Sequence, residues 1–462
     1  MSIVLSAERA LEAEKTVSNS GLENSQIALL AIAFALFAGL VMSRIMKPLK
    51  FPAVTGYLIA GILVGPSVLG QIPGFDRYIT PDLISSLSVV SDVALGFIAF
   101  SIGSEFKMSV LKKVGKQSVV IALFESLMAV LLVDAALIGL HFIIPEKLPI
   151  SAALTLGAIA SATAPAATMM VVKQYKAKGK VTEVLLPVVA LDDAIGLVAF
   201  AVSFGIAQAV QSNGGSIDVI SVVINPLLEI LLSLLIGGLL GGLLNLVEKI
   251  FKSNSKRLCL AVSFVFLTVS LAVLAEKGDW RIGDVEIRFS SLLTSMMLGT
   301  VFCNICSAAD EIMEKTDKWT MPIYILFFVF SGADLQFQFF KDPLLILIGL
   351  VYILIRVVGK YSGARLGAIL SKADPKVRKY LGFTLIPQAG VALGMSLMAV
   401  NAFPAEEGRI IRNTVLFGVL IYELIGPMVT KVVLKKSGDI VPKDALATTV
   451  AGDTPVDNDE DD

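Results

Sequence analysis

Charged residues are scarce in this chain. Only 17% of its 462 residues are Asp, Glu, Lys or Arg, whereas an ordinary soluble protein carries about 25%. Hydrophobic residues make up 55%, and the mean hydropathy is +0.81. The net charge of −1 excludes the basic surface typical of nucleic-acid-binding proteins. The composition predicts an integral membrane protein whose main solvent is the lipid bilayer.

Cysteine and histidine are also rare. The three cysteines exclude a disulfide scaffold, and Cys303 and Cys306 form a CxxC without the further ligands that a zinc site needs. The single histidine, His141, receives no role. No GxxxxGK[ST] phosphate loop occurs, which argues against an ATP-driven pump. We therefore expect no cofactor, no resident metal and no enzymatic activity.

Both ends of the chain are polar. Residues 1–25 lack the basic start and apolar run of a secretory signal, so we expect a short extramembrane segment. The other end finishes in DTPVDNDEDD. This acidic composition without aromatics predicts a disordered cytoplasmic tail over residues 437–462.

Between these ends, residues 26–436 contain thirteen stretches that are apolar and long enough to cross a membrane, which takes about 20 residues each. The predicted helices cover residues 26–46, 52–71, 84–106, 117–144, 149–172, 183–211, 218–248, 258–275, 289–307, 320–338, 343–370, 380–401 and 410–434. With the N-terminus outside, most of the 38 Lys and Arg residues fall in cytoplasmic connections, as the positive-inside rule requires. The number of spans and their orientation therefore support each other.

Two adjacent carboxylates lie near the middle of the sixth stretch, LLPVVALDDAIGLVAF. At 1.5 Å per residue, Asp192 and Asp193 sit close to mid-membrane. Burial raises the pKa of a carboxyl group and a bound cation lowers it, so such a group can exchange a proton for a metal ion. A helix-packing pair satisfied by its neighbours is the structural alternative. Charge at this depth favours an ion or proton site.

The eleventh stretch, ILIRVVGKYSGARL, carries two cations one helical turn apart, Arg356 and Lys360. Arg356 lies too deep to reach water and needs an anion. We expect Asp192 to be its partner. Lys360 is a possible second cation, or it extends toward the membrane surface.

Two stretches contain helix breakers at similar depth. The fifth reads SATAPAATMMVV, where Pro165 removes a backbone donor and Thr163 adds a hydroxyl. The twelfth reads LIPQAGVALG, with Pro387 and Gly390. Matching interruptions in two halves are typical of transporters built from inverted repeats. We expect two six-helix inverted repeats, helices 1–6 and 8–13, whose crossed discontinuous helices form the site.

Other polar or small residues within the stretches are weaker signals. Each intramembrane carboxylate could touch the ion path or face a helix contact: Asp92, Glu105, Glu125, Asp134, Glu229, Asp334 and Glu423. The segment from Gly237 to Gly242 reads GGLLGG and contains overlapping GxxxG patterns, which predict close helix packing.

Several of these segments resemble the bacterial and archaeal monovalent cation/proton antiporters of the sodium/hydrogen exchanger superfamily. The resemblance rests on FPAVTGYLIAGILVGPSVLG, GFIAFSIGSEF, SATAPAATMMVV, VVALDDAIG, FFVFSGADL and IRVVGKYSGARLGA in this order. It implies a homodimer, a dimerisation domain, and a mobile core of helices from about 117–211 and 343–434 that moves like an elevator.

The resemblance also implies residue roles. Asp193 matches the ion- and proton-binding aspartate, and Thr163 matches the polar residue of the broken helix. Asp192 matches the neighbour that pairs with a cation of the eleventh helix. Arg356 falls where many relatives have lysine, and Gln388 lies in the segment where many have glutamate.

The combined interpretation is a secondary Na⁺/H⁺ antiporter of the plasma membrane, with its N-terminus outside and its C-terminus in the cytoplasm. A K⁺/H⁺ antiporter with the same site is the first alternative, since side-chain oxygens alone do not separate Na⁺, Li⁺ and K⁺. A cation channel, a membrane sensor and an organic-anion transporter are more distant ones. A channel would show a continuous polar stripe, and a sensor would carry a soluble output domain.

Overall fold

A computed structural model of the protein describes residues 27–49, 51–72, 84, 87–108, 115–212, 225–278, 281–282, 285–286, 288–335 and 341–440. The predicted polar segment 1–25 and residues 441–462 of the predicted tail lie outside the described residues.

Helices make up nearly all of the described chain, which confirms the all-α fold class. After a first helix, Ile27–Met46, they are α2 (Ala53–Val64), η1 (Leu69–Gln71), α4 (Ser88–Glu105), α6 (Lys116–His141), α7 (Ile150–Ile159), α8 (Pro165–Gln174), α9 (Lys180–Ser212), α10 (Asn225–Glu248), α11 (Asn254–Lys277), α12 (Ser291–Ile305), α13 (Ala309–Ala333), α14 (Pro343–Leu370), α15 (Pro375–Tyr380), η4 (Leu381–Leu385), α16 (Gly390–Ala402) and α17 (Ala405–Ser437). Between α11 and α12, β1 (Arg281–Ile282) and β2 (Val285–Glu286) form a short antiparallel hairpin.

The predicted number of thirteen spans is not confirmed. Within the described residues, seven helices are long and apolar enough to cross a membrane, and a bent pair, Pro375–Leu385 with Gly390–Ala402, makes an eighth. Other predicted stretches form shorter apolar helices, such as the 15 residues of α12 and the 10 residues of α7. A helix of that length is shorter than the hydrocarbon core of about 30 Å.

Most helix bounds follow the hydrophobic pattern, and α14 coincides with its predicted stretch. The exception is α13, which begins at Ala309 rather than near residue 320. Its first turns carry the ion pairs Glu311–Lys315 and Glu314–Lys318 at i,i+4 spacing. Such pairs stabilise helix in a polar stretch that hydropathy alone assigns to a loop.

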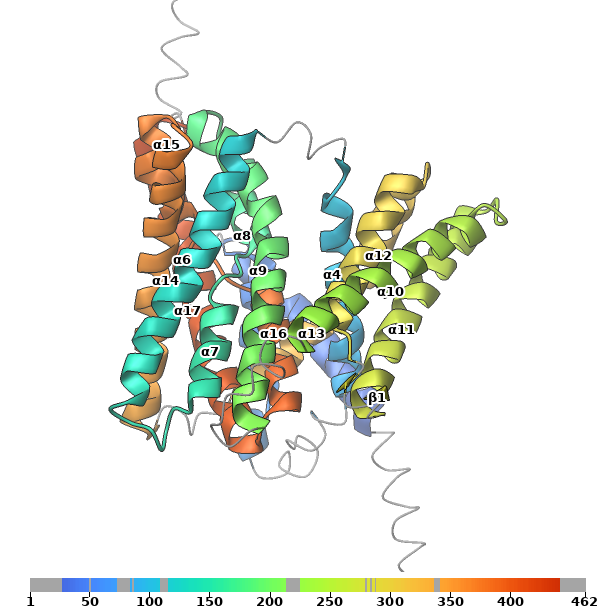
Figure 1. Ribbon diagram of the computed structural model, residues 1–462, viewed down its shortest axis with the longest axis horizontal. Helices are drawn as coiled ribbons and strands as arrows, with labels where there is room; N and C mark the ends of the chain where they lie inside the picture. The colour runs from blue at the N-terminus through green and yellow to red at the C-terminus, as the bar shows by residue number, and fades with distance from the viewer. Residues whose placement is uncertain are drawn as a thin grey trace, which may run out of the picture.

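The helices form two groups. Figure 1 shows α6, α7, α9, α14 and α17 on one side and α10, α11 and α12 on the other. A long helix, a broken helix and a long helix follow one another twice, first as α6, α7/α8 and α9, then as α14, η4/α16 and α17. This recurrence agrees with two repeats. Their inverted relation and the division into a mobile core and a dimerisation domain stay predictions.

Glycines bring the helices of each group close together. On α14, a methyl group at Gly363 would lie 2.5 Å from the carbonyl oxygen of Phe124, and one at Gly359 would lie 2.7 Å from Cα of Ala129. In the other group, methyl groups at Gly237 and Gly241 of α10 would lie 2.4 and 2.8 Å from backbone oxygens of α12. The prediction of close packing at GGLLGG is confirmed for these two positions.

The predicted start of the disordered tail at residue 437 is wrong for residues 437–440. Helix α17 continues to Ser437 and ends in a left-handed Gly438, at φ 88°. The next side chain, Asp439, is buried and accepts hydrogen bonds from the backbone N–H and the hydroxyl of Thr182, at 2.8 and 2.9 Å. It thereby caps the start of α9, a contact that composition does not reveal.

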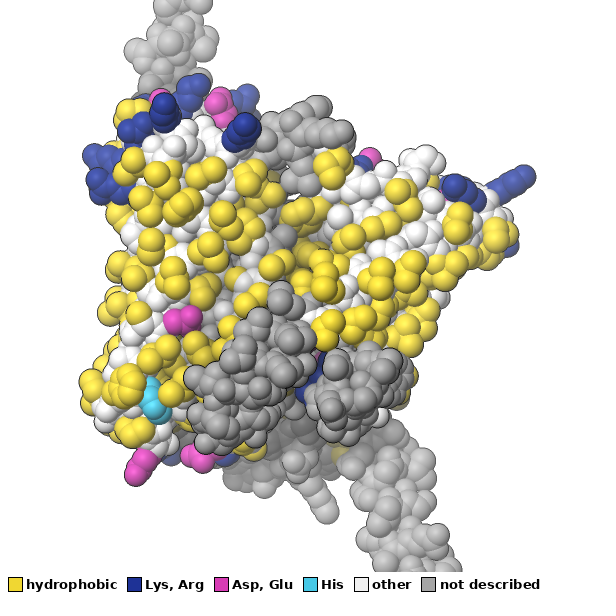
Figure 2. Space-filling model, in the orientation of Figure 1, with side chains coloured by type: hydrophobic (Ala, Val, Ile, Leu, Met, Phe, Trp, Pro, Cys, Tyr) yellow, Lys and Arg dark blue, Asp and Glu magenta, His cyan; other side chains and the backbone are white. Residues whose placement is uncertain are grey.

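The surface carries the polarity expected of a membrane protein. In Figure 2, hydrophobic side chains cover the middle of the molecule, and Lys and Arg gather at the end where α15 lies. Among the exposed hydrophobic side chains, Leu131, Leu239 and Leu354 are each more than 60% exposed. Exposed apolar area of this extent fits a bilayer as surrounding solvent. Which end faces the cytoplasm stays a prediction.

Candidate functional site

Two helix breaks contact each other in the first group of helices. Helix α7 ends at Ile159 and α8 begins at Pro165, while η4 ends at Leu385 and α16 begins at Gly390. The breaks are joined by two hydrogen bonds, from Ala164 N–H to the Pro387 carbonyl and from the Gln388 amide to the Ile159 carbonyl, each 2.8 Å. The predicted breaks at Pro165 and at Pro387 with Gly390 are therefore present. Proline explains them, because it lacks the N–H and clashes with the preceding turn.

Arg356 of α14 satisfies the carbonyl groups that these breaks leave without helical partners. Its fully buried guanidinium donates to the carbonyl oxygens of Ala160, Ile386 and Ala162, at 2.9, 2.7 and 2.5 Å. It also lies over the ring of Tyr422, 4.6 Å from the ring centre. A cation is favourable here because the carboxyl end of a helix carries partial negative charge.

One turn further along α14, Lys360 holds two carboxylates. Its ammonium nitrogen lies 3.0 Å from Asp192 Oδ2 and 2.8 Å from Glu125 Oε2, and it also donates to the carbonyl oxygen of Ser161. The hydroxyl of Ser126 donates to Asp192 Oδ1 at 2.5 Å. Four buried side chains from α6, α9 and α14 thus form one ionic cluster beside the break in α7.

The predicted pair of Asp192 with Arg356 is wrong. The hydrogen bonds described for the guanidinium go to the three carbonyl groups, and the cation beside Asp192 is Lys360. The alternative in which Lys360 extends to the membrane surface is also wrong, because its side chain is fully buried. The helix breaks, and not Asp192, bind Arg356. Their unwound backbone offers several fixed carbonyl acceptors that fit the planar fork of the guanidinium.

Thr163 and Asp193 differ in what the structure describes. Thr163 lies in the break before α8, 2% exposed; its hydroxyl lies near Asp192 but makes no hydrogen bond of ordinary geometry with a described residue. Asp193 follows Asp192 in α9, but its side chain is outside the described residues. Its role therefore stays a prediction.

A cavity of about 430 Å³ reaches the breaks from one end of the bundle. Thr163, Ala389 and Gly390 line it on the side of the breaks. Its other walls include the start of α2, the middle of α17 and the end of α4. A methyl group at Gly390 would meet the Phe328 ring at 3.4 Å, an ordinary van der Waals contact.

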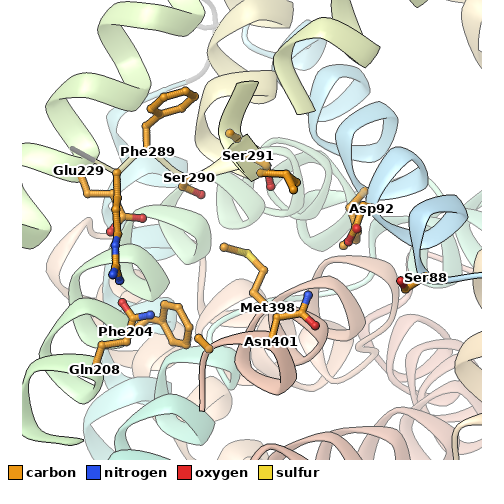
Figure 3. A pocket seen from close by; sticks show the side chains of 15 residues that line it. Ser88, Asp92, Phe204, Gln208, Glu229, Phe289, Ser290, Ser291, Met398 and Asn401 are labelled. Atoms are coloured by element: carbon orange, nitrogen blue, oxygen red, sulfur yellow. The ribbon is translucent and has the colours of Figure 1, made fainter. Parts of the chain in front are cut away.

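A second cavity, of about 440 Å³, lies toward the other end of the same helices. It is lined by the first turn of α4 at Ser88 and Asp92, by the end of α16 at Asn401, and by Gln208 and Glu229 (Figure 3). Between the two cavities, Leu95 of α4 packs on Gly394 of α16, where a methyl group would lie 2.3 Å from the leucine side chain. The two cavities thus lie on opposite sides of an apolar contact.

Sequence reasoning found only part of this cluster. Glu125 is one of several intramembrane carboxylates, and nothing in the sequence selects it. Residues 125, 192 and 360 are far apart in the chain, and only helix packing brings them together. Ser126 carried no signal. Within the described residues, no group of three His, Cys, Asp or Glu side chains could hold a metal ion.

Comparison with known proteins gives the family. The family model for the transmembrane part of the sodium/hydrogen exchanger matches residues 32–436. The Na⁺/H⁺ antiporter of Enterococcus hirae is 23% identical over 415 residues, which cover 88% of this chain and 97% of that protein. Na⁺/H⁺ antiporter 1 of Methanocaldococcus jannaschii is 24% identical and is covered over 92% of its length. A match of 30% identity to cation/H⁺ antiporter 19 of Arabidopsis thaliana spans 24% of this chain and 15% of that protein.

The fold is shared with a solved structure. The sodium proton antiporter MjNhaP1 from Methanocaldococcus jannaschii at pH 8 superimposes with a TM-score of 0.68 at 20% identity, covering 89% of this chain and 99% of that one. The family model confirms the resemblance seen in the sequence motifs. The chain belongs to the sodium/hydrogen exchanger family of membrane-spanning cation/proton antiporters.

Proposed function

We propose that this protein exchanges a monovalent cation for protons at Asp193 and Asp192 of α9, with Thr163 contributing to the site. The observation that carries the proposal is the buried cluster in which Lys360 lies between Asp192 and Glu125, beside two crossed helix breaks. Its helices come from the two recurring units α6–α9 and α14–α17.

The charge of this cluster supports exchange. With both carboxylates ionised, Glu125, Asp192 and Lys360 together carry one net negative charge inside the protein. An uncompensated buried charge is costly, so the cluster favours uptake of one proton or one cation. Asp193, on the same helix turn, is the residue proposed to accept either one. Because one carboxylate binds only one of the two at a time, their fluxes are coupled without ATP.

Two cavities on opposite sides of the Leu95–Gly394 contact support alternating access. We propose an elevator movement, in which the helices of about 117–211 and 343–434 slide against a dimerisation domain in a homodimer. The cavity at the breaks opens near the ends of α2 and α4 that adjoin Lys47 and Lys107. In the proposed orientation, with the N-terminus outside, this is the cytoplasmic side of a plasma membrane.

Na⁺ is the proposed cation, because relatives from Enterococcus hirae and Methanocaldococcus jannaschii that match along most of their length are named Na⁺/H⁺ antiporters. K⁺ at the same site is the second candidate. The reason is Gln388, which is buried beside Tyr352 in the second break. Its amide is neutral, whereas many relatives have a charged glutamate in this segment.

The test is transport by purified protein in liposomes that carry an entrapped pH dye, with Na⁺, Li⁺, K⁺ and Rb⁺ added in turn. Wild-type protein should move protons in response to Na⁺, and Asp193→Asn should abolish the response while expression and the gel-filtration profile remain normal. Glu406→Gln, the same chemical change on an exposed side chain of α17, serves as the control. Wild-type transport by Asp193→Asn would exclude this site. Cation flux without proton movement would indicate a channel.

A further inference from the structure

Glu423 is a buried carboxyl that the ionic cluster does not use. It lies on α17, is 1% exposed, and lines the same cavity as Thr163, Ala389 and Gly390. The Thr55 hydroxyl lies beside it, but neither of its oxygens accepts a hydrogen bond of ordinary geometry from a described residue, and no described cation pairs with it. Glu125 and Asp192, by contrast, are both held by Lys360.

Two buried hydroxyl groups accompany this carboxyl. Thr55 of α2 lies beside Glu423, and Thr163 lies in the helix break on the wall of the cavity, near Asp192. Neither hydroxyl makes a hydrogen bond of ordinary geometry with a described residue. Buried polar groups are nearly always satisfied, so the unsatisfied side chains of Glu423 and Thr163 on the cavity wall indicate a missing ligand.

The chemistry of these groups selects the ligand. They offer only oxygen: the two carboxylate atoms of Glu423 and the hydroxyls of Thr55 and Thr163. Oxygen ligands suit hard cations, whereas an anion would meet a negative charge. The cavity of about 430 Å³ leaves room for an ion that keeps part of its water shell.

We propose that Glu423, together with the hydroxyl of Thr55, forms an accessory site for a monovalent cation on the way from the cavity mouth to the helix breaks. The site holds the ion after entry and passes it to α9. This inference rests on the proposed antiport function and assigns a second carboxylate to the cation path.

The experiment compares half-saturating Na⁺ concentrations in the liposome assay for wild type, Glu423→Gln and Glu423→Asp. Loss of the charge should raise this concentration roughly tenfold at a similar maximal rate, as expected for losing one hydrogen-bonded charged contact. Glu423→Asp keeps the charge and should recover most of the affinity. Glu407→Gln is the matched control: Glu407 lies on the same helix and is buried, but its carboxylate accepts a hydrogen bond from Ser151 and does not line the cavity.

An unchanged half-saturating concentration in Glu423→Gln overturns the inference, and so does an equal rise in Glu407→Gln. If Glu423→Gln fails to fold, Thr55→Val tests the same site. It should raise the half-saturating concentration about threefold for one lost neutral contact, and no change overturns the inference. A wild-type protein that responds to none of the cations contradicts the proposed function itself, so the two failures are distinguishable.

Discussion

At the scale of single residues, the two cations of α14 have different tasks. Arg356 binds backbone carbonyls of both breaks, whereas Lys360 binds the carboxylates of α6 and α9. Arginine presents a rigid fork of donors and lysine a compact point charge, so the two side chains are not interchangeable. Arg356 fixes the geometry of the breaks, and Lys360 sets the charge of the cluster.

Replacing Lys360 with alanine should destabilise the protein strongly. Glu125 and Asp192 would then face each other without a cation, and breaking a buried ion pair costs about 3–5 kcal/mol. Thermal denaturation in detergent measures the loss. Adding Asp192→Ala removes the repulsion between the two carboxylates, so the double variant should lose less stability than the sum of the single variants.

The corresponding cycle of Arg356→Ala with Asp192→Ala is the control and should show a smaller coupling energy. A larger coupling for arginine than for lysine would restore the pairing expected from the sequence and contradict the contacts described above.

At the scale of elements, a row of glycines positions the cluster. Gly359, Gly363 and Gly367 recur every fourth residue on α14 and face α6, whose backbone they approach closely. This approach is what lets Glu125 reach Lys360 across the two helices. Small residues at such spacing are a general means of close helix contact in membranes.

Gly363→Val should therefore impair both stability and transport. The added side chain would collide with the backbone of Phe124 and Glu125, where even a methyl group lies 2.5 and 2.7 Å away. Overpacking costs about 1–3 kcal/mol, and the displaced helix carries Glu125 away from Lys360. Gly242→Val in α10 is the control, because a methyl group there meets no atom within 4 Å. Equal melting temperatures and transport rates in the two variants would show that the α6–α14 contact is not restrictive.

The cap of α9 gives a second prediction at this scale. Asp439 accepts from both the N–H and the hydroxyl of Thr182 and connects the end of α17 to the helix that carries Asp192. Asp439→Ala should lower stability by about 1 kcal/mol, the usual cost of removing a helix cap, and Asp439→Asn should lose less. Identical melting temperatures for wild type and Asp439→Ala would show that the contact contributes nothing.

At the scale of the whole molecule, two cavities lie on opposite sides of the Leu95–Gly394 contact between α4 and α16. In the proposed alternating access, a central site is exposed to one of these sides at a time. If proton and cation compete there for one carboxylate, the competition must appear in the pH dependence of cation affinity.

The half-saturating Na⁺ concentration should rise about tenfold for each unit by which the pH falls, while the site is mostly protonated, because one unit corresponds to 1.36 kcal/mol. At higher pH it should level off, since no proton remains to be displaced. Liposome measurements from about pH 6 to about pH 9 should cover both the range in which protons compete and the range in which the affinity is constant, because burial raises the pKa of a carboxyl group. A constant affinity with a changing maximal rate would instead indicate a separate pH sensor.

The sequence by itself determined the features that depend on local chemistry. Mean hydropathy and the apolar runs predict membrane helices because lipid offers no partners for backbone groups, and α14 has the bounds that its pattern predicts. Pro165 and Pro387 predict the breaks because proline lacks the backbone N–H and clashes with the preceding turn, although α9, α13 and α17 continue through Pro187, Pro322 and Pro427. The order of motifs identified the family.

Only the tertiary structure decided which distant groups meet. Arg356 and Lys360 are one turn apart on the same face of α14, so either cation could pair with Asp192 as far as the sequence shows. In the structure Arg356 binds the carbonyl groups that the breaks leave free, and Lys360 pairs with Asp192. Glu125 and Glu423 look alike as intramembrane carboxylates, yet one is held by Lys360 and the other faces a cavity. The physical reason is that the role of a buried charge depends on the groups that surround it on other helices, and helix packing decides which groups those are.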